Sequence, residues 1–363
     1  MGKYILYIDS MQRGGAQRVM TILAEHLSKT GEVILVNDIL PVPDIPEYTI
    51  GGGVRRLFLD EGAQGSGGRN LRRIRRLRQI IRQEQPDAVV SFLGPPNLRM
   101  LCAAAGCRTR KIVSVRNDPY REYGAGVKKT AARLAFHLAD AAVFQTEEAT
   151  GYFGKSIRKK AALIPNPISR SFYEADWTGT GRNIIAVGRV QPQKNYPLLL
   201  AAFSRIARDH PDVDVDICGD GYLRDSLTRL ADELGIGQRV HFHGIVSDIP
   251  RRLASSGVFV MTSDYEGMPN ALMEAMAVGV PVIATDCPCG GPRALTENGT
   301  YGVLVPRGDP EALAQALHEM LAGTERAEYY HQKAKERAEA YRTEKVMQAW
   351  DRILSASSDR RKR

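Results

Sequence analysis

Two glutamates, eight positions apart, have the residue types and spacing that best suit ligand chemistry in this chain. Glu266 lies in a Gly/Pro-rich loop, and Glu274 lies in a run of good helix formers predicted over 270–278. A helix start presents backbone N–H groups without partners, and a carboxylate accepts hydrogen bonds from several hydroxyls. The pair therefore suits a sugar and a ribose better than a metal or a peptide. Two solvated glutamates beside an ordinary turn are the alternative.

Two cations follow an expected strand in the second half of the chain. Arg189 comes directly after Gly188, and Lys194 lies five residues further on. The planar fork of an arginine and the point charge of a lysine can neutralise a diphosphate together and support its departure as a leaving group. A surface loop with two solvated cations fits the same pattern.

Glycine-rich loops follow two other expected strands and precede helical patterns. Gly14 and Gly15 allow backbone N–H groups to approach a phosphate closely, although no third glycine completes a dinucleotide fingerprint. Gly219 lies in Cys-Gly-Asp-Gly, which lacks the last glycine of GxGxxG. This disfavours a nicotinamide site and leaves open a neighbouring nucleoside or a turn without a ligand.

Three polar residues, Arg116, Asn117 and Asp118, end an expected strand of the first half, and Pro119 then turns the chain. Side chains at this position can hold a hydroxyl nucleophile or the donor sugar. An Asx-type turn without a ligand is the alternative.

Metal binding is not expected. The carboxylates of Asp212-Val-Asp-Val-Asp216 alternate with valines, so in a strand they share one face and do not converge as a loop would make them. The five cysteines contain no CxxC pair, which argues against zinc and against a disulfide framework and fits a reducing cytoplasm.

These residues must be positioned by alternating strands and helices. The expected strands cover 4–8, 32–36, 88–92, 111–115, 141–144, 184–188, 213–218, 239–242, 257–261 and 281–284. The expected helices cover 16–28, 69–84, 128–138, 196–209, 222–234, 270–278, 311–322, 325–341 and 343–355. Such alternation predicts an α/β fold of doubly wound parallel sheets, whose ligands bind at the carboxyl ends of strands.

A chain of 363 residues exceeds one average core, and the alternation pauses at Pro165-Asn-Pro167. We therefore expect a first Rossmann-like domain over 1–165, a second over 166–342 and an intervening cleft. The segment 343–363 is expected to form a C-terminal helix with a basic tail, and this helix can pack back on the first domain.

The net charge of +9 is concentrated in seven arginines between Arg69 and Arg82 and in Arg360-Arg-Lys-Arg363. Apolar residues recur at near-helical spacing in the first cluster, which predicts a helix that is charged on one face. That face can be a foot on anionic lipid, a cradle for a lipid diphosphate or simply a solvated surface. Few aromatics interleave with the arginines, so nucleic acid is not expected. No apolar run approaches ~20 residues, which favours a cytoplasmic protein, peripheral on the inner leaflet.

The ordered set of motifs resembles retaining glycosyltransferases of the GT4 family, whose GT-B fold has two Rossmann-like domains. The resemblance covers nearly the whole chain. It rests on Gly-Gly-Ala-Gln-Arg at 14–18, Pro-Asn-Pro at 165–167, Gly-Arg at 188–189 with Lys-Asn at 194–195, Gly-Asp-Gly at 219–221, and Glu-x7-Glu with Ala-x-Gly-x-Pro at 277–281.

The resemblance implies a role for each residue that matches a family motif. The Gly15 N–H would contact the donor diphosphate, which Arg189 and Lys194 would clamp. Glu274 would hold the ribose. Glu266 would contact the transferred sugar, helped by the backbone at Gly267, Met268, Pro269 and Asn270, and the loop His243-Gly-Ile245 would frame the base. Many relatives have a histidine where this chain has Arg116-Asn117-Asp118.

The resemblance also implies a function. We expect a UDP-sugar donor, transfer of a hexose or N-acetylhexosamine with retention of configuration, and no cofactor or metal. The acceptor would be a glycan or a polyprenyl-diphosphate-linked glycan, as in cell-surface polysaccharide biosynthesis. A nucleotide-sugar epimerase of GT-B shape and a basic nucleic-acid-binding or scaffold protein are the alternatives.

Overall fold

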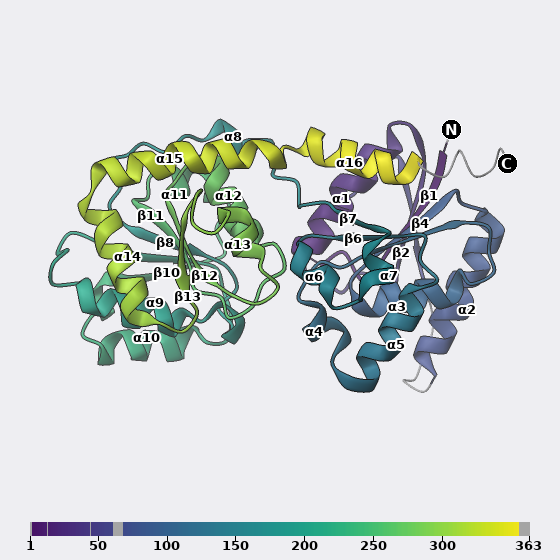
Figure 1. Cartoon of the computed structure of the whole chain (residues 1–363), viewed down its shortest axis with the longest axis horizontal. Helices are drawn as coiled ribbons and strands as arrows, with labels where there is room; N and C mark the ends of the chain where they lie inside the picture. The colour runs from purple at the N-terminus through teal and green to yellow at the C-terminus, as the bar shows by residue number, and fades with distance from the viewer. Residues whose placement is uncertain (1, 13, 44, 61–67, 356–363) are drawn as a thin grey trace. The chain divides into compact units, whose positions relative to one another are not determined.

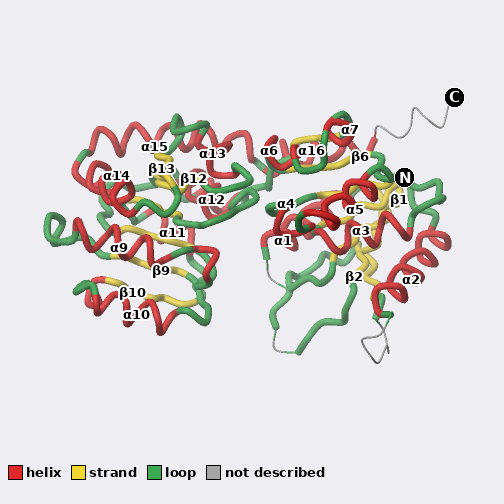
Figure 2. The backbone as a smooth tube through the Cα atoms, turned by 60° about the horizontal axis from the view of Figure 1, so that its bottom comes forward, coloured by secondary structure: helices red, strands yellow, loops and turns green. Residues whose placement is uncertain are grey.

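The computed structural model describes residues 2–12, 14–43, 45–60 and 68–355. The chain forms two compact units (Figures 1 and 2). Unit 1 comprises Met1–Asn166 and Val346–Arg363, and unit 2 comprises Pro167–Lys345. The chain thus passes from unit 1 to unit 2 within the Pro-Asn-Pro segment and returns inside its last described helix.

Unit 1 contains a sheet of seven parallel strands in the order β3-β2-β1-β4-β5-β6-β7. The strands are β1 Gly2–Ile8, β2 Gly31–Asn37, β3 Val54–Phe58, β4 Ala88–Phe92, β5 Arg110–Ser114, β6 Ala141–Phe144 and β7 Ala161–Leu163. The strand order reverses direction between β1 and β4, which is the switch point where open parallel sheets place their ligands.

The helices of unit 1 are α1 Gly15–Ser28, α2 Arg69–Glu84, α3 Gly94–Ala103, α4 Pro119–Tyr123, α5 Gly126–Phe136, α6 Glu147–Gly151 and α7 Lys155–Arg158. The last described helix, α16 Thr343–Ser355, joins the core of this unit. Trp350 of α16 is fully buried, and its ring stacks on Phe92 with centroids 5.7 Å apart. Residues from the two ends of the chain therefore share one core.

Unit 2 contains a sheet of six parallel strands in the order β10-β9-β8-β11-β12-β13. The strands are β8 Ile184–Val187, β9 Val215–Cys218, β10 Val240–Gly244, β11 Val258–Met261, β12 Val282–Asp286 and β13 Val303–Pro306. The helices are α8 Arg170–Glu174, α9 Tyr196–Ile206, α10 Arg224–Glu233, α11 Ile249–Ala254, α12 Asn270–Val278, α13 Gly291–Thr296, α14 Pro310–Ala322 and α15 Thr324–Ala338, with short 3₁₀ turns η1 Pro192–Lys194, η2 Gly237–Arg239 and η3 Glu339–Tyr341.

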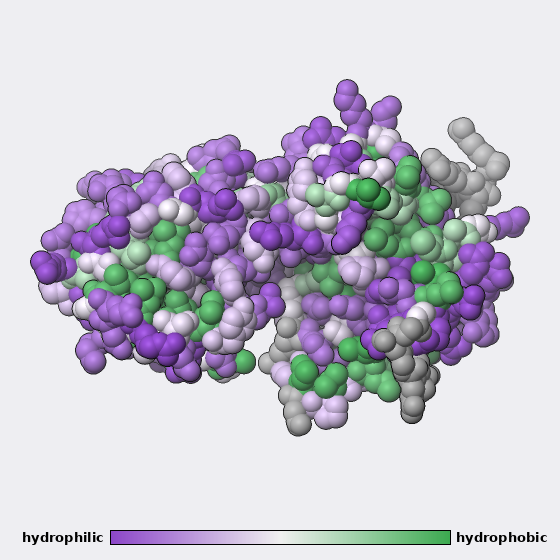
Figure 3. Space-filling model, turned by 90° about the horizontal axis from the view of Figure 1, so that it is seen from below, coloured by the Kyte–Doolittle hydropathy of each residue, from purple (hydrophilic) through white to green (hydrophobic). Residues whose placement is uncertain are grey.

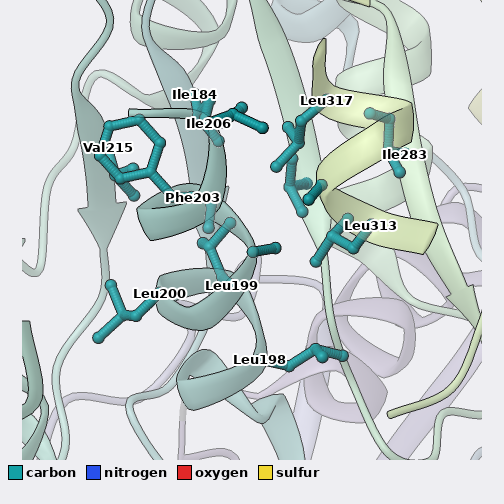
Figure 4. Packing of buried hydrophobic residues seen from close by; sticks show 14 of the residues in the cluster. Ile184, Leu198, Leu199, Leu200, Phe203, Ile206, Val215, Ile283, Leu313 and Leu317 are labelled. Atoms are coloured by element: carbon teal, nitrogen blue, oxygen red, sulfur yellow. The ribbon is translucent and has the colours of Figure 1, made fainter. Parts of the chain in front are cut away.

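One core of unit 2 lies between its sheet and the helices α9 and α14. Leu199 and Phe203 of α9 and Leu313 and Leu317 of α14 belong to this core, and all four are almost completely buried (Figure 4). The two residues of each helix are four positions apart, so each helix turns one apolar face to the strands. Burial on this scale fixes the strand ends and the loops that follow them.

The expected α/β fold of two doubly wound parallel sheets is confirmed. The sequence expectation omitted three strands, β3, β7 and β13. Each lies at an edge of its sheet, and each has five residues or fewer. An edge strand is covered less completely than a central one, so β3 can carry Arg55 and Arg56 and lacks the continuous apolar run that marks a buried strand.

Candidate functional site

A lysine and a glutamate form the centre of the candidate site in unit 2. The Lys194 ammonium nitrogen lies 2.7 Å from Oε1 of Glu266. The Ser263 hydroxyl donates a hydrogen bond to the same oxygen at 2.9 Å. The two charged side chains are only 16% and 11% exposed. Two residues that the sequence analysis assigned to one ligand therefore meet at the carboxyl ends of β8 and β11.

Hydrogen bonds connect the loops that carry this pair. The Gln193 side chain donates to the Tyr265 carbonyl at 2.9 Å, and the Asp264 N–H donates to the Gln193 carbonyl at 2.9 Å. The Asn195 amide donates to the Asp264 carboxylate at 3.0 Å. Because backbone groups take part, the spacing of the two loops is fixed before any ligand arrives.

Arg189 differs from Lys194 in its surroundings. It is exposed, and among the described residues the structure records no hydrogen bond or ion pair for its guanidinium. Its neighbour Val190 is fully buried, which fixes the backbone on that side. Arg189 is thus a cation on an anchored loop, with its charge open to an anion from solvent.

Glycines let the loop after β9 lie directly against the loop that carries Arg189. A Cβ on Gly219 would lie 1.9 Å from the Gly188 carbonyl oxygen, and one on Gly221 would lie 2.2 Å from the Val190 carbonyl oxygen. The Val190 N–H donates to the Asp220 carbonyl at 2.9 Å. Close backbone approach accounts for these glycines, and a nucleoside contact at Gly219 stays a prediction.

The segment from Gly267 to Asn270 leads into α12. Pro269 precedes the helix and provides no side-chain cap, while the Met273 N–H bonds the Pro269 carbonyl at 3.2 Å. The backbone N–H groups of the first turn precede that bond, so they are the donors that a helix start offers to a ligand. Glu274 and Met268 are each 8% exposed.

Residues of β12 and of the start of α13 pack against this segment and the residues before it. A Cβ on Gly291 would lie 1.8 Å from the Gly267 carbonyl oxygen. The Thr285 hydroxyl donates to the Ser263 carbonyl at 2.7 Å. Gly291 therefore has a packing reason, and Thr285 is a supporting residue that the sequence did not reveal.

The loop expected to frame a base follows β10. His243 lies on the strand, with its ring nitrogen 2.6 Å from an Asp216 carboxylate oxygen. Ile245, directly after the strand, is 83% exposed. A large apolar side chain so open to solvent is available to a flat ligand.

In unit 1, α1 begins at Gly15, directly after the loop that follows β1. Gly14 precedes the helix in an extended conformation and provides no side-chain cap, and the Arg18 N–H bonds the Gly14 carbonyl at 3.0 Å. The expected helix start is therefore present, with N–H groups in its first turn that no side-chain cap satisfies. Their contact with a donor phosphate stays a prediction.

Arg116 is buried, whereas its place after a strand suggested a side chain that is open to a ligand. Its guanidinium donates to the Asn166 side chain at 3.0 Å and lies 4.4 Å from the centre of the Phe92 ring and 5.4 Å from that of Trp350. Burial lowers the pKa of Arg116 to about 9, which leaves it charged at neutral pH. These contacts join β4, the end of unit 1's first segment and α16.

Asn117 and Asp118 form the Asx-type turn that was the alternative to a ligand site. The Asp118 carboxylate accepts a hydrogen bond from the Tyr120 N–H at 2.9 Å and so caps α4. The Asn117 side chain accepts from the Asp118 N–H at 2.8 Å. Both side chains thus have local structural partners, and ligand contacts from them stay predictions.

A cavity of about 350 Å³ in unit 1 went unnoticed in the sequence. It is lined by Asp9, Ser10, Gln12, Asp38, Ile39, Arg73, Pro95, Pro96 and Arg99. Asp9 and Asp38 each follow an apolar strand, β1 and β2. A carboxylate directly after a buried strand is the signal that could have revealed the cavity.

Buried charges support the wall of this cavity. The Tyr7 hydroxyl donates to Asp38 at 2.6 Å, and Arg99 donates both to the Tyr7 oxygen at 2.8 Å and to Asp38. Arg73 also donates to Asp38, at 3.2 Å. Burial raises the pKa of Asp38 although the two arginines lower it. The network therefore pairs its charges internally.

Neither a metal centre nor a membrane-spanning helix is found among the residues that the structure describes. Across the residues that the structure describes, no group of three or more His, Cys, Asp or Glu side chains is arranged to hold a metal ion. Among the helices formed by those same residues, none has the length and apolarity needed to cross a membrane.

Two family models match consecutive parts of the chain. The Glycosyltransferase Family 4 model matches residues 13–172, and the model for glycosyl transferases group 1 matches residues 171–337. Together with the two parallel sheets and the clustered strand-end residues, these matches show that the chain belongs to the glycosyltransferases of GT-B fold.

Relatives of known name agree with this class. A Campylobacter jejuni enzyme named as a 4-alpha-N-acetylgalactosaminyltransferase acting on a diphospho-undecaprenol-linked glycan is 28% identical, with 95% of this chain and 97% of that protein covered. The amylovoran biosynthesis glycosyltransferase AmsD of Erwinia amylovora is 23% identical, with 98% and 100% covered. These names are of transferases, so the epimerase alternative is not favoured.

Solved structures share the fold. HepE of Anabaena, in complex with UDP and glucose, matches with a TM-score of 0.79 and 19% identity over 98% of this chain and 100% of its own. The lipopolysaccharide outer core galactosyltransferase WaaB matches with a TM-score of 0.76 and 17% identity over 98% and 99%.

Proposed function

We propose that this glycosyltransferase moves a hexose or N-acetylhexosamine from a UDP-sugar to a glycan or lipid-linked acceptor, with retention of anomeric configuration, in cell-surface polysaccharide biosynthesis. The observation that carries the proposal is the Lys194–Glu266 pair, held 2.7 Å apart after two neighbouring strands. The same loop system carries Arg189, an exposed cation without a side-chain partner among the described residues. One acid and two cations suit a ligand that combines hydroxyls with a diphosphate.

Different residues would bind the diphosphate and the sugar groups of the donor. Arg189 has an open charge, and Lys194 can share its ammonium protons between Glu266 and a phosphate oxygen. Both cations would stabilise the charge that develops as the diphosphate leaves. Glu274 would hold the ribose. The HepE complexes with UDP support this choice of nucleotide.

Retention follows if the acceptor hydroxyl approaches the face from which the diphosphate departs. Glu266 is occupied by hydrogen bonds from Lys194 and Ser263, which suits a residue that positions hydroxyls better than one that attacks the anomeric carbon. We therefore assign positioning to Glu266 and charge stabilisation to Arg189 and Lys194.

No metal is needed in this proposal, because Arg189 and Lys194 provide two positive charges for the diphosphate. We expect turnover to be unchanged when EDTA is present and no divalent ion is added. A loss of turnover that Mg²⁺ or Mn²⁺ restores would contradict this part of the proposal.

The acceptor would bind in unit 1, where the cavity lined by Asp38, Arg99 and Ser10 is available. Two Campylobacter jejuni relatives are named for glycans linked to undecaprenol through a diphosphate, which supports a lipid-linked acceptor. Paired charges and hydroxyl-binding side chains in one pocket suit a sugar residue of such an acceptor.

The donor is tested by thermal unfolding with a panel of sugar nucleotides. A ligand that binds only the folded chain raises its melting temperature, so UDP and one UDP-sugar should stabilise the chain more than GDP-sugars do. The Arg189→Ala variant should lose that shift. NMR of the product then gives its anomeric configuration, and inversion would reject the retaining mechanism.

A further inference from the structure

Helix α5 of unit 1 presents an apolar stripe to solvent. Val127 and Leu134 are 86% and 66% exposed, and Leu138, just after the helix, is 46% exposed. With the exposed Ala131 they recur at i, i+4, i+7 and i+11, which is the spacing of one helical face. The opposite face carries the buried Phe136. Figure 3 shows the molecule from below with respect to Figure 1. Apolar side chains are visible there at the surface of unit 1.

Cations accompany this stripe without any acid on the same helix. Lys128, Lys129 and Arg133 belong to α5, and the segment 123–139 contains no Asp or Glu. The Lys129 ammonium lies 3.1 Å from the hydroxyl of Tyr120, which is 55% exposed. An amphipathic ring, an apolar stripe and flanking ammonium groups are the components of an interfacial helix.

Helix α2, where the sequence placed an electrostatic foot, has exposed arginines but little exposed apolar surface. Arg73 is engaged by Asp60 and Asp38, and Arg78 donates to two carbonyls of the α3 region, Ala103 and Ala105. Among the residues of α2 that the structure describes, Leu71 is the one large apolar residue that is exposed. Charge without apolar surface gives binding that is screened by salt and does not enter the bilayer.

We propose that α5 is the membrane-contacting surface of this protein, and that its partner is an anionic lipid bilayer. Val127, Leu134 and Leu138 would enter the boundary between headgroups and acyl chains, while the exposed Lys128 contacts anionic headgroups. Arg133 donates a hydrogen bond to the Tyr152 carbonyl at 2.6 Å and so belongs to the side of α5 that packs on the protein. An apolar stripe beside an exposed ammonium group, with no Asp or Glu in the segment 123–139, suits a negatively charged fluid surface. The inference goes beyond the proposed function and does not depend on the donor or on the reaction.

The test is flotation of the full chain with vesicles of phosphatidylcholine, alone or mixed with phosphatidylglycerol. The wild-type chain should float with the mixed vesicles and bind less at high salt. The double variant Val127→Ser/Leu134→Ser should bind the mixed vesicles roughly tenfold more weakly, because it no longer transfers two large apolar side chains from water into the bilayer. The matched control Tyr222→Ser/Tyr329→Ser changes residues of unit 2 that are 73% and 51% exposed, and should bind as wild type.

A second variant reports the depth of α5 directly. Leu134→Trp should show a blue-shifted emission with the mixed vesicles and be quenched by brominated acyl chains, above the signal of the native Trp177 and Trp350. Thermal unfolding verifies that every variant is folded.

Three outcomes would overturn the proposal. One is unchanged flotation of the double variant. Another is loss of flotation in Arg75→Gln/Arg76→Gln while the α5 variant still floats, which would make α2 the contact. The last is absence of flotation together with a concentration-dependent dimer that the α5 variant abolishes, which would make a second copy the partner.

Discussion

Each unit gathers charged side chains at the carboxyl ends of parallel strands, but the two sets are neutralised differently. In unit 1, Asp38 receives hydrogen bonds from Arg73, Arg99 and Tyr7, and it is 2% exposed. In unit 2, Lys194 and Glu266 pair with each other, while Arg189 stays exposed without a partner among the described residues.

The difference shows that a charge at a strand end can serve the fold, the ligand or both. A buried charge must be paired within the protein, because leaving water is costly for an uncompensated ion. An exposed cation on a rigid loop has no such requirement and can be satisfied by substrate. We therefore expect substitutions in the unit 1 network to affect folding first and those at Arg189 to affect turnover first.

The largest effect is expected for Arg99→Met. The change removes donors to Asp38, to Tyr7 and to Asn70 and leaves the carboxylate with less compensation. We expect the free energy of unfolding in urea to fall by about 3–5 kcal/mol at neutral pH. The pKa of Asp38 is already raised by burial, so the loss should shrink in acid as this carboxyl becomes protonated. Arg170→Met, which breaks the exposed pair with Glu174, should cost ~0–1 kcal/mol. Equal costs for the two variants would contradict the role of burial.

Arg189→Ala should reduce turnover and leave the stability of the fold almost unchanged. If its guanidinium stabilises the departing diphosphate, kcat should fall by about 10²–10³, or about 2.7–4 kcal/mol. The free energy of unfolding should stay within about 0.5 kcal/mol of wild type, because the side chain is exposed. Arg208→Ala removes another exposed arginine of unit 2 and should leave kcat unchanged. An Arg189 variant with normal kcat would contradict the proposed role of Arg189 in stabilising the departing diphosphate, whatever the stability of the variant.

A pH-dependent effect is expected for Glu122 in unit 1. Burial raises the pKa of Glu122 to about 8, from 4.5, with a further contribution from Asp118. The folded chain therefore favours the neutral carboxyl, so its contribution to stability is present below pH 4.5 and is lost as the pH rises towards 8. Glu122→Gln should raise the free energy of unfolding by about 2–4 kcal/mol at the upper end of this window and change it little at the lower end.

Urea unfolding of both proteins across this pH range measures the difference. A control is Glu148→Gln on α6, where the carboxyl is exposed. A gain for Glu122→Gln that is the same at both ends of the range would show that the carboxyl is not neutral in the folded chain.

Much of the fold was predictable because strands and helices are encoded locally. Continuous apolar runs rich in β-branched residues, such as Val-Ile-Leu-Val at 33–36, are typical of strands buried on both faces, and alternation with helical patterns then implies parallel pairing. The ends of the strands and the glycines after them identified the loops at 188–195 and 263–270, and the structure brings these loops together.

The rest depended on contacts between distant parts of the chain. Lys194 and Glu266 are 72 residues apart, so the spacing of the motifs could not reveal an ion pair. Arg116 was expected at an open strand end, and only the return of α16 covers it with Trp350. The Asp38–Arg99 network combines residues 61 apart from different elements, each unremarkable in sequence. The basic tail at 360–363 and part of the loop before α2 lie outside the described residues.

The smallest effect is expected for Ser263→Ala, which refines the contrast within unit 2. The Ser263 hydroxyl is fully buried and donates to Glu266 at 2.9 Å, while the ion pair with Lys194 remains in the variant. Loss of one such hydrogen bond costs about 1 kcal/mol, so kcat/KM should fall about fivefold. Ser204→Ala removes a hydroxyl that bonds a carbonyl on α9 and should leave kcat/KM unchanged. If Glu266 orients the transferred sugar, the Ser263 change should alter discrimination between UDP-hexose and UDP-N-acetylhexosamine as well as the rate. A variant that loses stability but keeps both rate and discrimination would show that the hydroxyl serves packing alone.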